Sequence, residues 1–149
     1  MDKTILEKLS EQITKIEATL AKLDVNINGS KDLDIQRLSL QNPIHIAEIL
    51  RIKTLKLGLI GKLKAECYRA VKLYESINEV KVSEKRLELH AASPDEKITI
   101  LNDRIKIYMK KENLDLVEVK YLQEFYMISY NALEKNIEAI KYKYNAFKR

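Results

Sequence analysis

Along the first 24 residues, apolar side chains recur at alternating intervals of three and four positions. They are Leu6, Leu9, Ile13, Ile16, Leu20 and Leu23. This spacing gives the a and d positions of three heptads, with lysines and glutamates between them. The pattern predicts a helix over residues 1–24. A stripe this narrow needs another helix beside it, either in the same chain or in a second copy.

Turn and capping residues then mark the end of this helix and the start of the next. The segment 26–30 (Asn-Ile-Asn-Gly-Ser) is typical of a loop. Asn42 followed by Pro43 is typical of a helix start, because Asn is a favoured N-cap and proline fits the first helical position. The sequence therefore predicts one very long central helix over residues 43–91.

Two glycines, Gly58 and Gly61, lie inside this predicted long helix. Each weakens a helix by about 1 kcal/mol relative to alanine. Close packing against another helix, or a bend, is the explanation that we favour. The alternative is backbone that is exposed beside a ligand.

A third helix is predicted to begin at Ser93 and Pro94 and to end near Lys111. Serine is a good N-cap, proline fits the next position, and Glu96 is placed for a capping box. Residues 113–115 (Asn-Leu-Asp) then interrupt the pattern and restart it.

The last predicted helix follows this interruption and runs nearly to the C-terminus, with Asp115 and Glu118 at the spacing of another capping box. Only three glycines and two prolines occur in 149 residues, which leaves little material for hairpins. We therefore predict an all-α fold, a self-associating bundle of four main helices in one domain. Its last two helices form a pair over residues 94–149.

The composition favours a binding protein over an enzyme. The chain has two histidines and no tryptophan, and it contains no glycine-rich phosphate loop, no Cys or His pair at metal-ligand spacing and no nucleophile motif. Its carboxylates lie among lysines at the spacing of a helix surface, where solvation is the default interpretation. We expect no catalytic activity, no metal and no cofactor.

No sequence feature indicates a membrane or an oxidising compartment. There is no run of about 18 apolar residues, and the N-terminal residues lack the apolar stretch of a signal peptide. The single cysteine, Cys67, cannot form an internal disulfide and is expected to be a small core side chain. These observations predict a soluble protein of the cytoplasm.

The net charge of +5 is concentrated in one part of the long helix. Residues 51–72 contain seven basic residues and one acidic residue, whereas residues 1–50 carry a net charge of −2 and residues 73–149 of +1. Helices usually balance their charges through pairs one turn apart. An ordinary solvated face explains this segment poorly, and a polyanionic partner is favoured.

Helix geometry places several of these cations on one face. At about 100° per residue, Arg51, Lys62 and Arg69 fall near one line over a length of about 27 Å, and Lys72 lies roughly 60° to one side. We call these four residues the basic ladder. Tyr68 lies near the ladder and could stack on a base.

A second basic cluster around Tyr108 in the third predicted helix could extend the basic ladder. The residues expected to bind nucleic acid are Arg51, Lys62, Lys64, Tyr68, Arg69, Lys72, Arg104 and Lys106. Binding through several phosphates would weaken steeply with salt and show little sequence preference. A membrane surface is less favoured, because the face opposite the cations lacks the bulky aromatic residues of an interfacial helix.

The apolar positions of the last predicted helix spread over about half of its circumference, from Tyr121 to Phe147, which is wider than a surface helix of a small monomer usually needs. With the heptads of the first helix, this favours a closed homo-oligomer, a ring if subunits join head to tail. Burial of both sides within one chain is the alternative. The expected interface residues are Leu6, Leu9, Ile13, Ile16, Phe125, Leu133, Ile137 and Ile140.

Five segments also follow one another in the order, spacing and character of a known family. They are Leu-Asp-Val-Asn-Ile at 23–27, Leu-Ser-Leu-Gln-Asn-Pro at 38–43, Leu-Lys-Ala-Glu-Cys-Tyr-Arg-Ala-Val-Lys-Leu-Tyr at 63–74, Asn-Leu-Asp-Leu at 113–116 and Tyr-Asn-Ala-Leu-Glu-Lys-Asn-Ile at 130–137. This layout resembles the UvsY-type recombination mediators of T-even-type bacteriophages over residues 23–149. The third segment resembles the basic helix to which that family's DNA contacts are assigned, which makes Arg69 and Lys72 candidate contacts.

The resemblance implies a ring-forming accessory protein of the host cytoplasm that binds single-stranded DNA. Such a protein helps to load a phage recombinase onto strands that single-strand-binding protein covers, and it needs no cofactor. The leading alternative is a helical structural or adaptor protein, such as a small virion component, whose basic helix packs against an acidic protein partner.

Overall fold

The computed structural model describes residues 3–25 and 42–148, and all regular structure in these two ranges is α-helical. The helices are α1 (Ile5–Val25), α2 (Pro43–Ala92), α3 (Ile98–Glu112) and α4 (Leu114–Lys148). The predicted all-α fold of four main helices is confirmed. The loop predicted at 26–30, and residues 38–41 of the UvsY-like pattern, lie outside the described residues.

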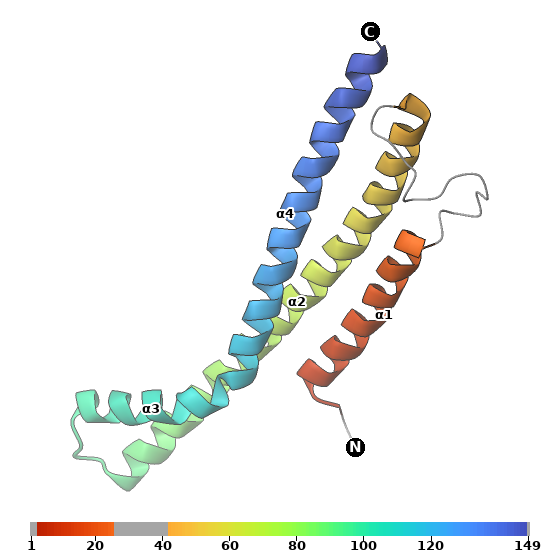
Figure 1. Ribbon diagram of the computed structural model, residues 1–149. Helices are drawn as coiled ribbons and strands as arrows, with labels where there is room; N and C mark the ends of the chain where they lie inside the picture. Colours follow the sequence, from red (N-terminus) through yellow and green to blue (C-terminus); the bar gives the residue numbers. More distant parts are fainter. Residues whose placement is uncertain (1–2, 26–41, 149) are drawn as a thin grey trace.

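Helix α2 runs through the length of the molecule, and the other three helices pack on it (Figure 1). Its 50 residues span about 75 Å at 1.5 Å per residue. It begins as predicted, with Pro43 in the first turn and the Asn42 side chain accepting a hydrogen bond from the Ile44 N–H at 3.0 Å. Helices α1 and α4 lie along α2 in the opposite direction, and α3 packs on its C-terminal end (Figure 1).

The main core forms where α1, α2 and α4 meet, and Leu63, Cys67 and Val119 are completely buried there. Its buried members are Leu9, Ile16, Leu63, Cys67, Ala70, Val71, Tyr74, Leu116, Val119 and Tyr126. The members from α2 fall within an arc of about 100° around that helix, so they share one face of it and leave the opposite face to solvent.

The predicted heptad stripe of the first helix is buried within the chain. Leu9 and Ile16 belong to the main core, and Leu6, Ile13 and Leu20 pack against it. The helix that this stripe needs beside it is therefore present in the same chain, and in fact two helices, α2 and α4, cover it.

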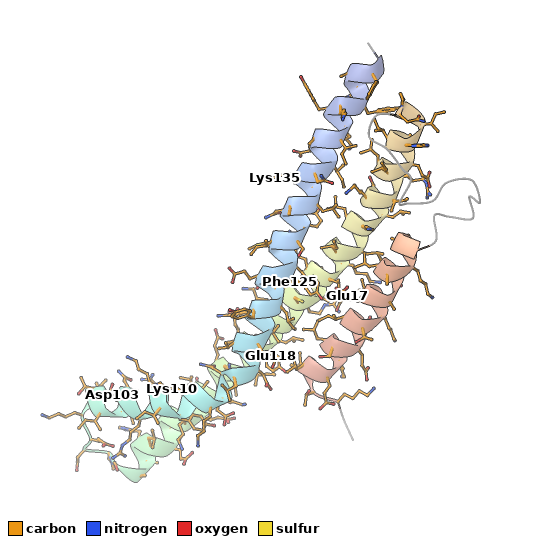
Figure 2. The ribbon with its side chains drawn as sticks, viewed as in Figure 1. Glu17, Asp103, Lys110, Glu118, Phe125 and Lys135 are labelled. Carbon is orange, nitrogen blue, oxygen red and sulfur yellow. The ribbon has the colours of Figure 1, made fainter. Side chains whose placement is uncertain are left out.

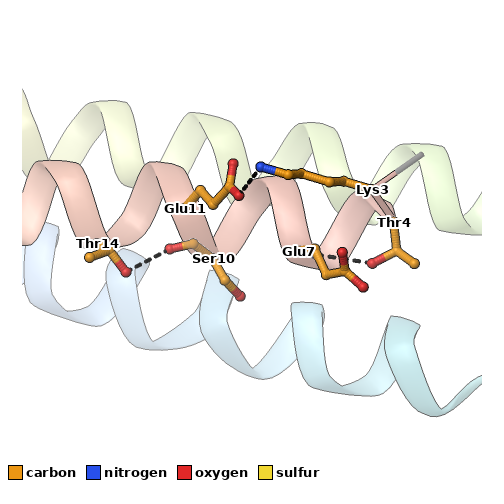
Figure 3. Close-up of polar contacts among 6 residues, drawn as sticks. All are labelled: Lys3, Thr4, Glu7, Ser10, Glu11 and Thr14. Carbon is orange, nitrogen blue, oxygen red and sulfur yellow. Dashed lines mark hydrogen bonds and ion pairs between the residues drawn. The ribbon is translucent and has the colours of Figure 1, made fainter. Parts of the chain in front are cut away.

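Two hydrogen bonds fix the start of α1. Thr4 Oγ1 accepts from the Glu7 N–H at 3.1 Å, as an N-cap side chain does (Figure 3). The N–H of Leu6 donates to the Tyr74 hydroxyl of α2 at 2.9 Å. Both donors belong to the first turn, where N–H groups lack a carbonyl partner within the helix.

The predicted start of the third helix is wrong, because α3 begins at Ile98 and without a side-chain cap. Ser93 is the C-cap of α2 rather than an N-cap. Pro94 lies in a turn that the Glu96 N–H closes on the Ser93 carbonyl at 3.2 Å. A serine followed by a proline suits the first two positions of a β-turn as well as a helix start, and here the turn forms.

A bend at Asn113 separates α3 from α4 (Figure 1). The buried Asn78 of α2 donates to Asn113 Oδ1 at 2.6 Å and ties this bend to α2. The predicted interruption is confirmed at Asn113 alone, because Leu114 and Asp115 already belong to α4. The predicted capping box is wrong, because Asp115 lies inside the first turn of α4 and not before it.

Candidate nucleic-acid interface

The face of α2 that points away from the core carries the basic ladder, and all four ladder residues are exposed. Tyr68 is 53% exposed, and Lys64 is half-buried. Arg69 borders a shallow groove beside α1, whereas Tyr68 and Lys64 border another beside α4. The candidate residues of α2 thus form a band that crosses its solvent face from the α1 side to the α4 side.

Three ladder cations contact a carboxylate three residues away on α2. The pairs are Arg51–Glu48, Arg69–Glu66 at 3.7 Å and Lys72–Glu75 at 3.9 Å. Two of these carboxylates lie just outside residues 51–72, and the range 48–75 contains seven basic and three acidic residues. The face therefore remains cationic, although less strongly than the shorter segment indicated. A partly exposed ion pair contributes only about 0–1 kcal/mol to stability, so a phosphate can replace the carboxylate beside each cation.

A groove of about 310 Å³ lies between α2 and α4, beside Lys72. Its lining residues are Gly61, Lys64, Ala65, Tyr68, Gln123, Met127 and Tyr130. We call it the aromatic groove. The Lys64 Nζ lies 4.6 Å from the centre of the Tyr130 ring, and the Lys72 Nζ lies 5.3 Å from the centre of the Tyr68 ring. Both distances are short enough for cation–π attraction, which holds each ring and its cation together.

Gly61 explains how the Tyr130 ring reaches this position. A Cβ atom at Gly61 would lie 3.2 Å from Cε2 of Tyr130, so the ring packs almost directly on the backbone of α2. This agrees with the favoured explanation of close helix packing. Nothing lies within 4 Å of a Cβ built at Gly58, and the structure gives no reason for that glycine.

The α4 side of the aromatic groove was not found from the sequence. Gln123, Met127 and Tyr130 follow one another at intervals of four and three, which places them on one face of α4. That spacing was visible in the sequence. The identity of the helix that packs beside Tyr68 was not, because it depends on the tertiary arrangement.

The second basic cluster lies apart from the ladder, on α3, and its members are Arg104, Lys106, Lys110 and Lys111 (Lys110 is labelled in Figure 2). Arg104 forms an ion pair with Glu96 at 2.9 Å, next to the turn between α2 and α3. Lys106 borders a groove whose other charged residues are Glu75 and Glu79. The structure does not bring these two predicted contacts together with the ladder into one cationic surface.

The eight residues predicted to mediate self-association have different environments. Ile137 and Ile140 are buried in the chain, as are Leu9 and Ile16. Leu6, Ile13 and Leu133 are half-buried. Phe125 alone among the eight is exposed, at 59%.

In residues 3–25 and 42–148, no three acidic, histidine or cysteine side chains gather as they would around a metal ion. No helix in these ranges is long and apolar enough to cross a membrane. Burial raises the pKa of the Cys67 thiol to about 11, which keeps it a protonated core side chain at neutral pH.

The chain matches no protein-family model, no curated protein and no solved structure. The resemblance to UvsY-type mediators therefore stays a prediction.

Proposed function

We propose that the protein is a non-enzymatic accessory protein that binds single-stranded DNA along the solvent face of α2. The observation that carries this proposal is the position of the aromatic groove beside the basic ladder. Proteins that bind single strands without sequence preference combine cations along the backbone path with aromatic rings on which bases stack. The face of α2 offers both kinds of group within a few helical turns.

The ladder supplies the phosphate contacts. Its arginines and Lys72 exchange weak, solvent-screened pairs with neighbouring glutamates for phosphates, and the counterions that the strand releases favour this exchange. The aromatic groove supplies the base contact. Tyr68 presents an exposed ring at its edge, and Lys64 and Lys72 lie beside the two rings, where they can neutralise the phosphates that flank a stacked base.

The specific biological role that we propose follows from the resemblance to the UvsY-type family. In this proposal the protein acts as a recombination mediator in the cytoplasm of the phage host, loading a recombinase onto strands covered by single-strand-binding protein. Self-association is part of the proposal, because a ladder of four cations is a modest site. Linking several copies along one strand commonly raises the overall affinity by about 10²–10⁴-fold.

The test is binding of a labelled oligonucleotide, single-stranded and duplex, followed by fluorescence anisotropy at several salt concentrations. Replacing Lys62, Arg69 and Lys72 with alanine should flatten the plot of log affinity against log salt by up to about two units, at ~0.7 per single-strand phosphate. The matched control is the alanine triple variant of Lys106, Lys110 and Lys111, which removes the same charge from α3.

Equal loss of slope in the two triple variants would mean that net charge and not the ladder governs binding. An unchanged slope in a folded ladder variant would place the DNA site elsewhere. Binding to an acidic protein and not to the oligonucleotide would support the alternative, a helical structural or adaptor protein.

A second variant tests the aromatic groove. Replacing Tyr68 with leucine should weaken binding by about 5- to 150-fold, the equivalent of the 1–3 kcal/mol of one stacked base, and should leave the salt slope unchanged. Tyr142→Leu is the control, since Tyr142 is 81% exposed on α4 and does not line the groove. Equal affinity of the two variants would remove the stacking contact from the proposal.

A further inference from the structure

The outer face of α4 exposes a continuous row of large apolar side chains. They are Leu114 (65% exposed), Val117 (56%), Tyr121 (76%), Phe125 (59%) and Ile128 (59%). At about 100° per residue these five positions fall within an arc of roughly 80°, opposite the buried positions of the same helix. We call this row the outer stripe. Singly exposed apolar residues are normal, whereas a contiguous row of this kind marks an interaction surface.

The spacing of the outer stripe is symmetric about its middle residue. The intervals along the chain are three, four, four and three, so Leu114 and Ile128 are equally far from Tyr121, and so are Val117 and Phe125. A two-fold axis at Tyr121 would set Leu114 of one copy opposite Ile128 of the other, and Val117 opposite Phe125, so apolar side chains would meet apolar side chains throughout an isologous contact. A partner of different sequence would give no reason for this symmetry.

The charges along one edge of the stripe agree with the same arrangement. Lys120 and Glu124 are both exposed, and helical geometry puts them on the same edge of the outer stripe. When two α4 helices run in opposite directions about a two-fold axis beside Tyr121, Glu124 of each copy lies close to Lys120 of the other. The symmetry produces this attraction twice.

The area of the stripe is sufficient for a specific pair. Side chains of this size at these exposures each present on the order of 100 Å². Two copies would then bury roughly 1,000–1,200 Å² in total, which is where specific interfaces begin.

We propose that two copies of this chain pair through the outer stripe, with their α4 helices antiparallel and the two-fold axis beside Tyr121. This geometry differs from the head-to-tail contact of a ring. It does not depend on nucleic acid. It leaves the basic ladder exposed in both copies, because the ladder lies on α2 and the stripe faces away from that helix.

Disulfide trapping tests the position of the axis. Tyr121→Cys should form a disulfide-linked dimer under mild oxidation, because the axis brings that residue opposite itself. Val117→Cys should not link to itself, because its two copies would be about 12 Å apart along the helix and a disulfide needs Cα atoms within about 7 Å. A mixture of Val117→Cys and Phe125→Cys should link. The native Cys67 is buried and gives no background.

Light scattering on a charge-swapped pair gives a second, independent test. Lys120→Glu and Glu124→Lys should each be mostly monomeric, because each places like charges across the axis. An equal mixture of the two should form heterodimers, because both contacts across the axis then join opposite charges. Within each single chain the Lys120–Glu124 attraction stays absent, so a purely intrahelical role predicts no recovery.

Three results would overturn the proposal. They are a wild-type protein that is monomeric at micromolar concentration, equal cross-linking of Tyr121→Cys and Val117→Cys alone, and no heterodimer in the charge-swapped mixture. Tyr121→Asp should also halve the particle mass, whereas Tyr142→Asp, on the same helix but outside the stripe, should leave it unchanged. Circular dichroism checks that each variant keeps its helices.

Discussion

The stripe of α1 and the outer stripe of α4 have similar sequence patterns and opposite environments. Leu9 and Ile16 of α1 are 4% and 6% exposed, whereas Tyr121 and Ile128 of α4 are mostly exposed. The reason is the number of helices available. The single stripe of α1 fits against α2 and α4, whereas α4 is apolar on two faces and the described part of the chain covers one of them. Periodicity therefore identifies a surface that needs a partner, and tertiary packing decides whether that partner is internal.

The largest effect expected from this comparison comes from one substitution made on both stripes. Leu9→Ala should lower the free energy of unfolding by about 2–5 kcal/mol, since it removes a buried side chain and leaves a cavity between three helices. Leu114→Ala should change it by less than about 0.5 kcal/mol per monomer, since that side chain is already in solvent. Urea denaturation at low protein concentration measures both.

The concentration dependence of the same experiment sharpens the comparison. If copies pair through α4, the stability of the wild type rises with protein concentration, and Leu114→Ala reduces that rise. Leu9→Ala should lower the stability at every protein concentration and leave the dependence of stability on concentration unchanged. Equal losses in the two variants at low concentration would contradict the difference in environment.

The local part of the fold was predictable from the sequence because it depends on residues within one turn of each other. Asn42 and Pro43 predicted the start of α2 correctly. The start of α3 was not predictable in the same way, since Ser93 and Pro94 satisfy the rules of a turn and of a helix cap equally well. The choice depends on how the chain leaves α2, and the C-cap of α2 at Ser93 takes the first residue of the expected helix signal.

In the candidate site, too, the features within one helix were predictable from the sequence and the features that depend on contacts between helices were not. The basic ladder followed from charge and helical geometry, because all of its members lie on one helix. The aromatic groove did not, because Tyr68 and Tyr130 come from helices whose contact only the fold establishes. The charge balance was also incomplete from the sequence segment alone, since Glu48 and Glu75 reach back to Arg51 and Lys72 across its ends.

A smaller effect is expected from the hydrogen bond that joins α4 to α1. The Tyr126 hydroxyl donates to Glu17 Oε1 at 3.0 Å. Tyr126→Phe should lower the free energy of unfolding by about 1 kcal/mol, the usual contribution of one such bond. Thermal or urea unfolding of the two proteins at pH 7 measures it, and no loss would mean that water replaces the hydroxyl at Glu17 without cost.

Alkaline pH should reduce the difference in free energy of unfolding between the wild type and Tyr126→Phe. Burial and the bond to Glu17 raise the pKa of Tyr126 to about 12, from 10.0 for a free tyrosine. The folded state therefore keeps the proton more tightly than the unfolded state, so this stabilisation is complete below pH 10 and is lost as the pH rises toward 12. The wild type should lose its advantage over Tyr126→Phe across that window, and a constant difference would contradict the raised pKa.

The smallest effect concerns the inner side of α4, where Tyr130 packs on α2, and it compares two glycines of one helix. Gly58→Ala should raise the free energy of unfolding by about 0.5–1 kcal/mol, because alanine loses less chain entropy in a helix and nothing lies within 4 Å of the new methyl group.

Gly61→Ala offers the same entropic gain, but its methyl group would lie 3.2 Å from the Tyr130 ring, which must shift outward by a few tenths of an ångström. The gain at Gly61 should therefore be smaller than at Gly58, and it should reach the same size when Tyr130 is replaced by alanine. That recovery is the coupling energy of a double-mutant cycle. Equal gains at both glycines with Tyr130 in place would mean that the ring moves freely, and the aromatic groove would then lack the fixed wall that a stacked base requires.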